Sequence, residues 1–265
     1  MQLPQGDQKL VQIMDAALAE AARRAGSWLA CRPGCTQCCH GAFAINALDA
    51  ARLETGMNAL RASDPKRAAE VETRAKAWIA EVGAEFPGDM ETGMLGTSEE
   101  DQARFETFAN DAPCPALNPE SGLCDVYEWR PMTCRVFGPP VRMEGEALGC
   151  CELCFVGASG DEITACEMPV PHELEARLVE EMGGTDETVV AYALKAGIRE
   201  QGLGNRESGI RRRRAISVPT VQRVSGALRD RESASQPPGR SATNSMFVFD
   251  ESGVRMRHSG EQNAA

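Results

Sequence analysis

Four cysteines lie within nine residues of this chain, in the run Cys-Arg-Pro-Gly-Cys-Thr-Gln-Cys-Cys that covers residues 31–39. Two of these thiols are adjacent, and the other two lie a few residues upstream, so all four can converge on one point. Such a density of thiolates is typical of a metal site. The run therefore predicts that a bound metal organises part of the fold.

Seven further cysteines follow, which brings the total to 11. Cys114, Cys124 and Cys134 are spaced ten residues apart, and a third group consists of Cys150, Cys151 and Cys154, with Cys166 beyond it. An odd number of clustered cysteines without a leading apolar segment does not fit a secreted disulfide framework. We expect a protein of the reducing cytoplasm, in which free thiols bind metals or do chemistry.

The net charge and the distribution of apolar residues limit the kinds of partner that the protein can bind. The net charge of −11 argues against a nucleic-acid-binding protein, apart from a contact by the arginine-rich tail around Arg211–Arg214. No stretch of about 20 apolar residues exists that could span a membrane. We expect a protein or redox partner.

The ligand type indicates which metals fit. Thiolates suit zinc and iron–sulfur clusters, and eight of them suit two four-thiolate sites. A cluster accommodates adjacent cysteines on different irons better than a single ion does, so an iron–sulfur cluster is favoured over zinc. Cys166 is expected in the core, and the third group has a redox-active thiol pair as its alternative role. The predicted ligands are Cys31, Cys35, Cys38, Cys39, Cys114, Cys124, Cys134, Cys151 and Cys154.

Two arginines lie beside the predicted ligands. Arg130 precedes Pro131, and Arg135 directly follows Cys134. Four thiolates leave about two negative charges on a divalent metal, by counting formal charges. We expect Arg130 and Arg135 to offset that charge by hydrogen bonding to sulfur and so to contribute to cofactor binding, although solvated surface positions are the alternative.

The periodicity of apolar residues predicts a mainly α fold with a small, irregular, cysteine-rich region packed on helices. Residues 110–170 hold most of the cysteines and little periodicity, so they are expected to be loop-rich. One metal-binding domain is predicted at residues 1–202, and residues 203–265 read as a disordered tail rich in Arg, Ser and Gly. The expected helices cover residues 8–29, 47–60 (capped by Asn46), 65–86 (capped by Asp64), 99–108 (capped by Ser98), 171–182 and 186–197.

The cysteine motifs resemble those of the YkgJ-like cysteine-cluster family, the CxxCxxCC zinc- or iron-chelating domain. The resemblance covers roughly residues 28–140 in two blocks, and it includes an acidic residue before Ala50. Three residues separate the first two cysteines here, where the family name implies two. The matching pieces are Cys31-x-x-Gly34-Cys35-x-x-Cys38-Cys39-His40, Cys114-Pro-x-Leu117, Gly122-x-Cys124-x-Val126-Tyr127-Glu128-x-Arg130-Pro131 and Cys134-Arg135.

Three functions follow as hypotheses. The first is a cytoplasmic protein that holds an iron–sulfur cluster or zinc and acts in electron transfer or as a cluster-dependent oxidoreductase. The second is a non-catalytic, zinc-stapled module that binds another protein. The third is a metalloenzyme with an open coordination position at one site. The sequence names no catalytic residue and leaves open whether the protein is an enzyme.

Overall fold

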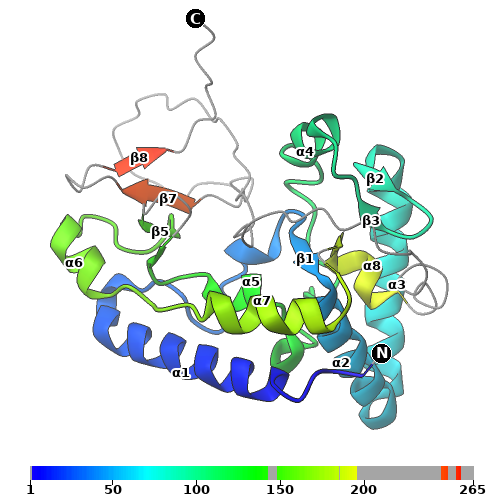
Figure 1. The fold of residues 1–265 in the computed structure, drawn as a ribbon, viewed down its shortest axis with the longest axis horizontal. Coiled ribbons are helices and arrows are strands. Elements are labelled where there is room, and N and C mark those ends of the chain that lie inside the picture. The colour runs from blue at the N-terminus through cyan, green and yellow to red at the C-terminus, as the bar shows by residue number, and fades with distance from the viewer. Residues whose placement is uncertain (1, 143–147, 185, 196–245, 250–254, 258–265) are drawn as a thin grey trace, which may run out of the picture.

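A computed structural model describes residues 2–142, 148–184, 186–195, 246–249 and 255–257. Helices dominate these residues (Figure 1), which confirms the predicted mainly α fold. The α-helices are α1 (Asp7–Ala25), α2 (Ala47–Ser63), α3 (Pro65–Val82), α4 (Glu99–Phe105), α5 (Met132–Val136), α6 (Gly160–Ala165), α7 (His172–Glu181) and α8 (Val190–Leu194). Short 3-10 turns are η1 (Gly26–Trp28), η2 (Gln37–Cys39), η3 (Gly83–Glu85) and η4 (Tyr127–Trp129).

The strands are short and pair antiparallel in three small sheets. They are β1 (Ala44–Asn46), β2 (Gly88–Asp89), β3 (Met94–Leu95), β4 (Val141–Arg142), β5 (Leu148–Cys151), β6 (Glu187–Val189), β7 (Met246–Phe249) and β8 (Arg255–Arg257). β1 pairs with β6, β2 with β3, and the largest sheet has the order β4-β5-β7-β8. Because β5 lies between β4 and β7, both of its edges are paired.

Three predicted helix starts are confirmed by their caps. The side chain of Asn46 accepts a hydrogen bond from the Asp49 N–H at the start of α2. Asp64 does the same for α3, with Pro65 at the first helical position, and Ser98 caps α4. Each cap satisfies a backbone N–H that has no partner within its helix.

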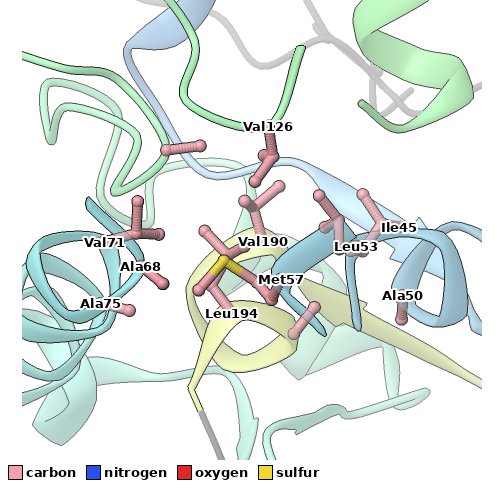
Figure 2. Close-up of a cluster of buried hydrophobic side chains, with 12 residues drawn as sticks. Ile45, Ala50, Leu53, Met57, Ala68, Val71, Ala75, Val126, Val190 and Leu194 are labelled. Atoms are coloured by element: carbon pink, nitrogen blue, oxygen red, sulfur yellow. The ribbon is translucent and has the colours of Figure 1, made fainter. Parts of the chain in front are cut away.

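Helices α2, α3 and α8 pack together around the largest apolar cluster (Figure 2), with Met57 of α2 at its centre. Ala68, Val71 and Ala75 form the face that α3 contributes. Their spacing of three and four residues places them on one side of the helix. Val126, from the cysteine-rich region, packs on the same cluster and joins that region to the helices.

A second apolar cluster lies where α1 packs against α5 and α7 (Figure 1). Leu10 and Met14 of α1 are completely or almost completely buried there, together with Leu178 of α7 and Met132 of α5. Helix α5 carries Cys134, so this packing fixes the position of one predicted ligand.

The predicted helix at residues 186–197 is confirmed only in part. Glu187–Val189 form β6, which pairs with β1, and Val190–Leu194 are helical, while residues 196–197 lie outside the described residues. The run Thr188-Val189-Val190 is β-branched throughout, a composition that favours a strand.

Residues 110–170 are loop-rich as predicted, with α5, α6, β4 and β5 as short elements within them. The predicted domain boundary at residue 202 and most of the predicted tail lie outside the described residues. Within that tail the structure describes β7 and β8, and the division of the chain stays a prediction.

Candidate metal centre

The first cysteine run forms a compact loop between η1 and β1. The N–H of Cys35 donates to the carbonyl of Arg32 at 2.9 Å, and that of Cys39 donates to Thr36 at 2.8 Å. Gly34 allows the first turn because its φ of +89° lies in the left-handed region that favours glycine. These turns separate Cys31, at the start of the loop, from Cys38 at its end.

The second cysteine group is attached to this loop by backbone pairing. The N–H of Cys114 donates to the carbonyl of Cys39 at 2.7 Å, and His40 forms a β-bridge with Pro113. A second bridge joins Leu117 to Cys124 and closes residues 117–124 into a hairpin-like loop. Cys114 and Cys124 are thereby brought to the same place despite the ten residues between them.

Cys134 reaches the same region on α5. A buried carboxylate, that of Asp49 in α2, accepts a hydrogen bond from the N–H of Met132 at 3.0 Å. This bond satisfies an N–H at the start of α5 and fixes the helix that carries Cys134. The sequence signal for Asp49 was the acidic residue before Ala50 in the family resemblance, to which no role was assigned.

Four thiols meet where these segments converge, and we call them the central thiol group: Cys38, Cys114, Cys124 and Cys134. Burial raises the pKa of the Cys134 thiol well above its usual range, and the other three sulfurs of the group raise it further. Burial likewise raises the pKa of Cys114 to about 12, again with contributions from sulfurs of the group. Without a metal these thiols are protonated at neutral pH, and a metal would displace their protons.

Backbone N–H groups surround the central thiol group. The N–H of Leu117 donates to the carbonyl of Cys114 at 2.9 Å. Backbone hydrogen bonds from Ala116 to the sulfur of Cys114 and from Val126 to that of Cys124 oppose the rise in the pKa of these thiols. Donors of this kind stabilise a thiolate more than a thiol, and they orient and tune metal-bound sulfur.

A separate cluster, which we call the Cys31 trio, contains Cys31, Cys151 and Cys154. Their thiols form hydrogen bonds with one another in all three pairs. The sulfur of Cys154 accepts from the other two and from the backbone N–H groups of Ala30 and Cys31. These hydrogen bonds lower the pKa of Cys154, and donation to Cys154 raises that of Cys151.

The predicted ligands are therefore not gathered in one place. Cys38 joins the central thiol group, whereas Cys31 joins two cysteines more than a hundred residues away in sequence. The Cys39 thiol hydrogen-bonds with Cys38 at the margin of the central group. Among the described residues, Cys35 has no thiol contact. Cys150 and Cys166 are buried in the same apolar cluster as the Cys31 trio.

Arg130 lies close to the central thiol group. Burial raises the pKa of Cys124, and the positive charge of Arg130 opposes that rise. Its guanidinium also lies 4.0 Å above the ring centre of Tyr127. The charge of Arg130 therefore favours the thiolate form of Cys124. The hydrogen bonds described for Arg130 go to the carbonyl of Tyr127 and to Asp15 and not to sulfur.

Arg135 has different partners from those predicted. Its side chain is completely buried, and its hydrogen bonds go to the carbonyls of Glu128 and Arg130 and to the carboxylate of Asp15. The hydrogen bonds described for Arg135 thus hold the backbone of residues 128–130 against α5 and do not reach sulfur. This arrangement positions the segment between Cys124 and Cys134.

A surface pocket of about 250 Å³ reaches Cys124 from solvent. The side chains of Arg67 and Asp125 lie on one wall, and Tyr127 and Trp129 form part of another. Asp125 is buried, and it accepts hydrogen bonds from Arg67 at 2.6 Å and from Arg74 at 2.5 Å. No local pattern predicts this pocket, because its lining residues come from α2, α3 and residues 124–129.

Neither group encloses an ion as it stands. In the part of the chain that the structure describes, no three Cys, His, Asp or Glu side chains are arranged as a ready-made metal-ion site. Thiols that share hydrogens lie near one another without converging on a common point, and a metal ion replaces those hydrogens when it binds. The donor set itself, thiols with backbone N–H groups directed at sulfur, fits zinc or an iron–sulfur cluster.

Residues 30–155 match the model of the CxxCxxCC family, which is described as a zinc- or iron-chelating domain. The matched span ends one residue after Cys154 and contains both thiol groups. The match confirms the family predicted from the cysteine motifs, although the YkgJ name is not part of it. No curated protein and no solved structure matches the chain. None of the described helices is both long and apolar enough to cross a bilayer.

Proposed function

We propose that this chain, whose residues 30–155 belong to the CxxCxxCC family of zinc- or iron-chelating domains, binds an iron–sulfur cluster at its central thiol group. The observation that carries the proposal is that three separate segments of the chain bring four half-buried cysteines close enough to influence one another's pKa. Four cysteine thiolates are the usual ligands of such a cluster.

Two features favour a cluster over a single ion. A cluster is larger than one ion, so it accommodates the adjacent cysteines Cys38 and Cys39 on different irons better than a single ion does. The N–H groups of Ala116 and Val126 donate to sulfur, which is one way in which proteins adjust the reduction potential of a cluster. A bound cluster would supply one-electron transfer.

The residues around the group suit electron exchange with a partner. The pocket at Cys124 gives access from solvent, and Tyr127 beside it is about half exposed. The charge of Arg130 offsets part of the negative charge that thiolates bring to a cluster. We therefore propose a redox partner that docks at this face and a role in electron transfer or cluster-dependent oxidoreduction in the cytoplasm.

Anaerobic purification of the full chain tests the proposal. The protein should be brown, contain iron and acid-labile sulfide, and lose its visible absorption when a reductant is added. Cys114→Ser combined with Cys134→Ser should abolish the colour, while Cys166→Ala should keep it, since Cys166 is buried outside the central group. A colourless wild-type chain without iron would refute the cluster.

A zinc-stapled protein-binding module is the second candidate. Leu123 and Tyr127 are large hydrophobic side chains that lie exposed on either side of Cys124 and Asp125. Exposed apolar residues beside a rigid metal site can form a docking surface. A colourless chain that carries zinc in the central thiol group and loses it in the Cys114→Ser, Cys134→Ser variant would favour this function.

A further inference from the structure

We infer that the Cys31 trio is a thiol–disulfide exchange site, at which Cys31 and Cys154 reduce a small-molecule disulfide and become joined by a disulfide bond of their own. The inference goes beyond the proposed function, because the trio is separate from the central thiol group and either activity can exist without the other. It rests on how the chain holds the three thiols together and on which of them solvent reaches.

Backbone hydrogen bonds hold the two segments that carry the trio in contact. The N–H of Phe155 donates to the carbonyl of Trp28 at 2.8 Å, which ties the segment after β5 to η1. The N–H of Cys154 donates to the carbonyl of Cys151 at 2.9 Å and closes the Cys-x-x-Cys turn. Cys31 is therefore held beside a pair of cysteines that follow it by more than a hundred residues.

The three sulfur atoms are close enough for a disulfide to form. Their thiols are hydrogen-bonded in all three pairs, and the three side chains belong to one apolar cluster. All three cysteines are free, so the structure shows the reduced form. In a disulfide the sulfurs lie about 2.05 Å apart and the Cβ atoms about 3.5–4.5 Å apart. Sulfurs that share a hydrogen can reach this separation by rotation of their side chains.

Exposure and hydrogen bonding give the three thiols different roles. Cys31 is partly exposed, whereas Cys151 and Cys154 are buried. A dissolved disulfide therefore meets Cys31 first. The sulfur of Cys154 accepts hydrogen bonds from both other thiols and from the backbone N–H groups of Ala30 and Cys31. These donors stabilise negative charge on Cys154, which makes it the better nucleophile of the two buried thiols.

The surroundings leave the sulfur of Cys31 room to move. Gly138 has a φ of +119°, and a Cβ there would lie 3.1 Å from this sulfur. Only glycine leaves Cys31 its full space. The N–H of Cys151 donates to the carbonyl of Gly138 at 3.4 Å, so the same glycine also positions the Cys-x-x-Cys turn.

The reaction proceeds in two attacks through a mixed disulfide. Cys31 attacks one sulfur of the small disulfide, and its hydrogen passes to Cys154 along the hydrogen bond between them. The S–S bond of the small disulfide breaks, and the leaving sulfur takes that hydrogen and departs as a thiol. The Cys154 thiolate then attacks the sulfur of Cys31 and releases the second half of the small molecule as a thiolate. Two protein sulfurs are thus oxidised to a disulfide, and the small disulfide is reduced.

A low-molecular-weight disulfide fits this site. A protein disulfide would have to bring its sulfurs to a half-buried thiol, whereas a peptide disulfide such as oxidised glutathione reaches Cys31 by diffusion. The exchange is reversible, because an excess of the small thiol attacks the protein disulfide in turn. Disulfides of this kind are transient in a reducing compartment, where they are catalytic or redox-sensing.

Peptide mapping of the full chain tests the inference. The protein is reduced, freed of reductant without oxygen, treated with oxidised glutathione and quenched with N-ethylmaleimide. Wild type should form a disulfide between Cys31 and Cys154 and release two glutathione molecules for each such bond, and Cys166→Ala should match it. The absence of this bond in wild type would overturn the inference, as would a bond between Cys151 and Cys154 that leaves Cys31 unreacted.

Two variants separate the two attacks. In Cys154→Ser the mixed disulfide on Cys31 should persist at least ten times longer than in wild type. In Cys31→Ser the oxidation of Cys151 and Cys154 should be at least tenfold slower than that of the wild-type trio. Wild-type rates in both variants would overturn the inference.

Cys35 provides an internal control that keeps the test valid if a variant fails to fold. It is partly exposed, and no thiol contact is described for it, so glutathione bound there should remain as a mixed disulfide while that on Cys31 is displaced. Equal persistence of the two mixed disulfides in wild type would overturn the inference. Iron, sulfide and colour, measured in the same samples, report on the central thiol group alone, so a failure of that proposal is recognised separately.

Discussion

Several charged side chains are buried around Arg52. Arg52 is 1% exposed and lies between the carboxylates of Asp7 and Asp49, with Glu175 close by. Three carboxyl groups thus share one guanidinium. The positive and negative charges of this group come closest to cancelling if one carboxyl group keeps its proton, because a buried charge without a partner is costly.

Burial raises the pKa of Asp49 as well as that of Glu175, and Glu175 is the one of the two for which no ion pair with Arg52 is described. The pKa of Glu175 rises to about 7, and the charge of Asp49 adds to the rise. The folded state therefore holds a proton on Glu175 that the unfolded chain releases above its usual pKa of 4.5. Stability from this residue is complete below pH 4.5 and is lost as the pH rises through 7, by an amount on the order of 3 kcal/mol.

Glu175→Gln should remove this loss, because the amide stays neutral and its oxygen can still accept the hydrogen bond from Asn46. We expect the variant to be more stable than wild type at pH 8 by about 1–3 kcal/mol and to match it near pH 4.5. Urea unfolding at several pH values measures this. Glu173→Gln, at an exposed position on the same helix, should leave the dependence of stability on pH as in wild type. If the stability of Glu175→Gln also falls with pH as steeply as that of wild type, Glu175 is not the residue that titrates.

Asp49→Ala should have the opposite effect. The change removes one carboxylate partner of buried Arg52 and the acceptor of the Met132 N–H. Loss of one partner of a buried ion pair costs about 3–5 kcal/mol. We expect the free energy of unfolding to fall by that amount and metal retention to weaken, because α5 positions Cys134. Glu70→Ala, which breaks an exposed pair with Lys66, should change stability by less than about 0.5 kcal/mol.

At the scale of elements, the contact between α2 and η4 depends on a glycine within a helix. A Cβ on Gly56 would lie 2.4–2.7 Å from atoms of Trp129. Trp129 belongs to η4, which lies between Cys124 and Cys134 in the chain. The helix therefore gives up side-chain volume and helix propensity at this position so that the cysteine-rich region can approach closely.

Gly56→Ala should accordingly destabilise the protein, although alanine favours a helix by about 1 kcal/mol. Displacement of Trp129 should cost about 1–3 kcal/mol beyond that gain, and metal content should fall. Thermal or urea unfolding measures the first effect and metal analysis the second. Gly83→Ala is the matched control, because its nearest neighbour would lie at 3.5 Å. If both variants gain stability, the close approach is not restrictive.

Elements with a local signal were predictable from the sequence, and their spatial combination was not. Asn46, Asp64 and Ser98 were predicted as caps because capping depends on residues three positions apart, and all three are confirmed. The strand at residues 187–189 was missed because β6 is formed by pairing with β1, about 140 residues earlier, which a local pattern does not report.

The candidate metal centre was likewise predictable only in part. The spacing of the cysteines indicated a metal site, and the resemblance of the motifs indicated the family, which the family match confirms. The separation of Cys31 from Cys38 was not readable, because it depends on where β5 places Cys151 and Cys154. The hydrogen bonds of Arg135 were not readable for a related reason, since one of them goes to Asp15 of α1, about 120 residues earlier in the chain.

For the molecule as a whole, the two thiol groups are supported by different parts of the fold. The central thiol group rests on α2 and α5 and on the paired loops around Cys39 and Cys114. The Cys31 trio depends on β5, which is paired with β4 on one side and with β7 on the other. Figure 1 places β5, β7 and β8 together, away from α2 and α3. Residues 246–249 are thus linked to one group of thiols and not to the other.

Truncation after residue 202 should separate the two groups. Loss of β7 leaves one edge of β5 unpaired, so its backbone amides should exchange with solvent faster. We expect hydrogen exchange of Leu148–Cys151 to accelerate at least tenfold. Exchange in α2 and α3, together with the metal of the central thiol group, should stay as in the full chain.

A point substitution gives the same test without shortening the chain. Val248 pairs with Gly149, and Val248→Pro removes a backbone N–H from β7 and hinders its pairing with β5. This variant should reproduce the faster exchange of Leu148–Cys151, whereas Ser233→Pro, outside both β7 and β8, should not. Identical exchange in Val248→Pro and wild type would mean that β7 does not protect β5. The Cys31 trio would then be positioned by the backbone bond from Phe155 to Trp28 and the side-chain bond from Gln37 to Glu152, and removal of residues 203–265 should leave the exchange of Leu148–Cys151 unchanged.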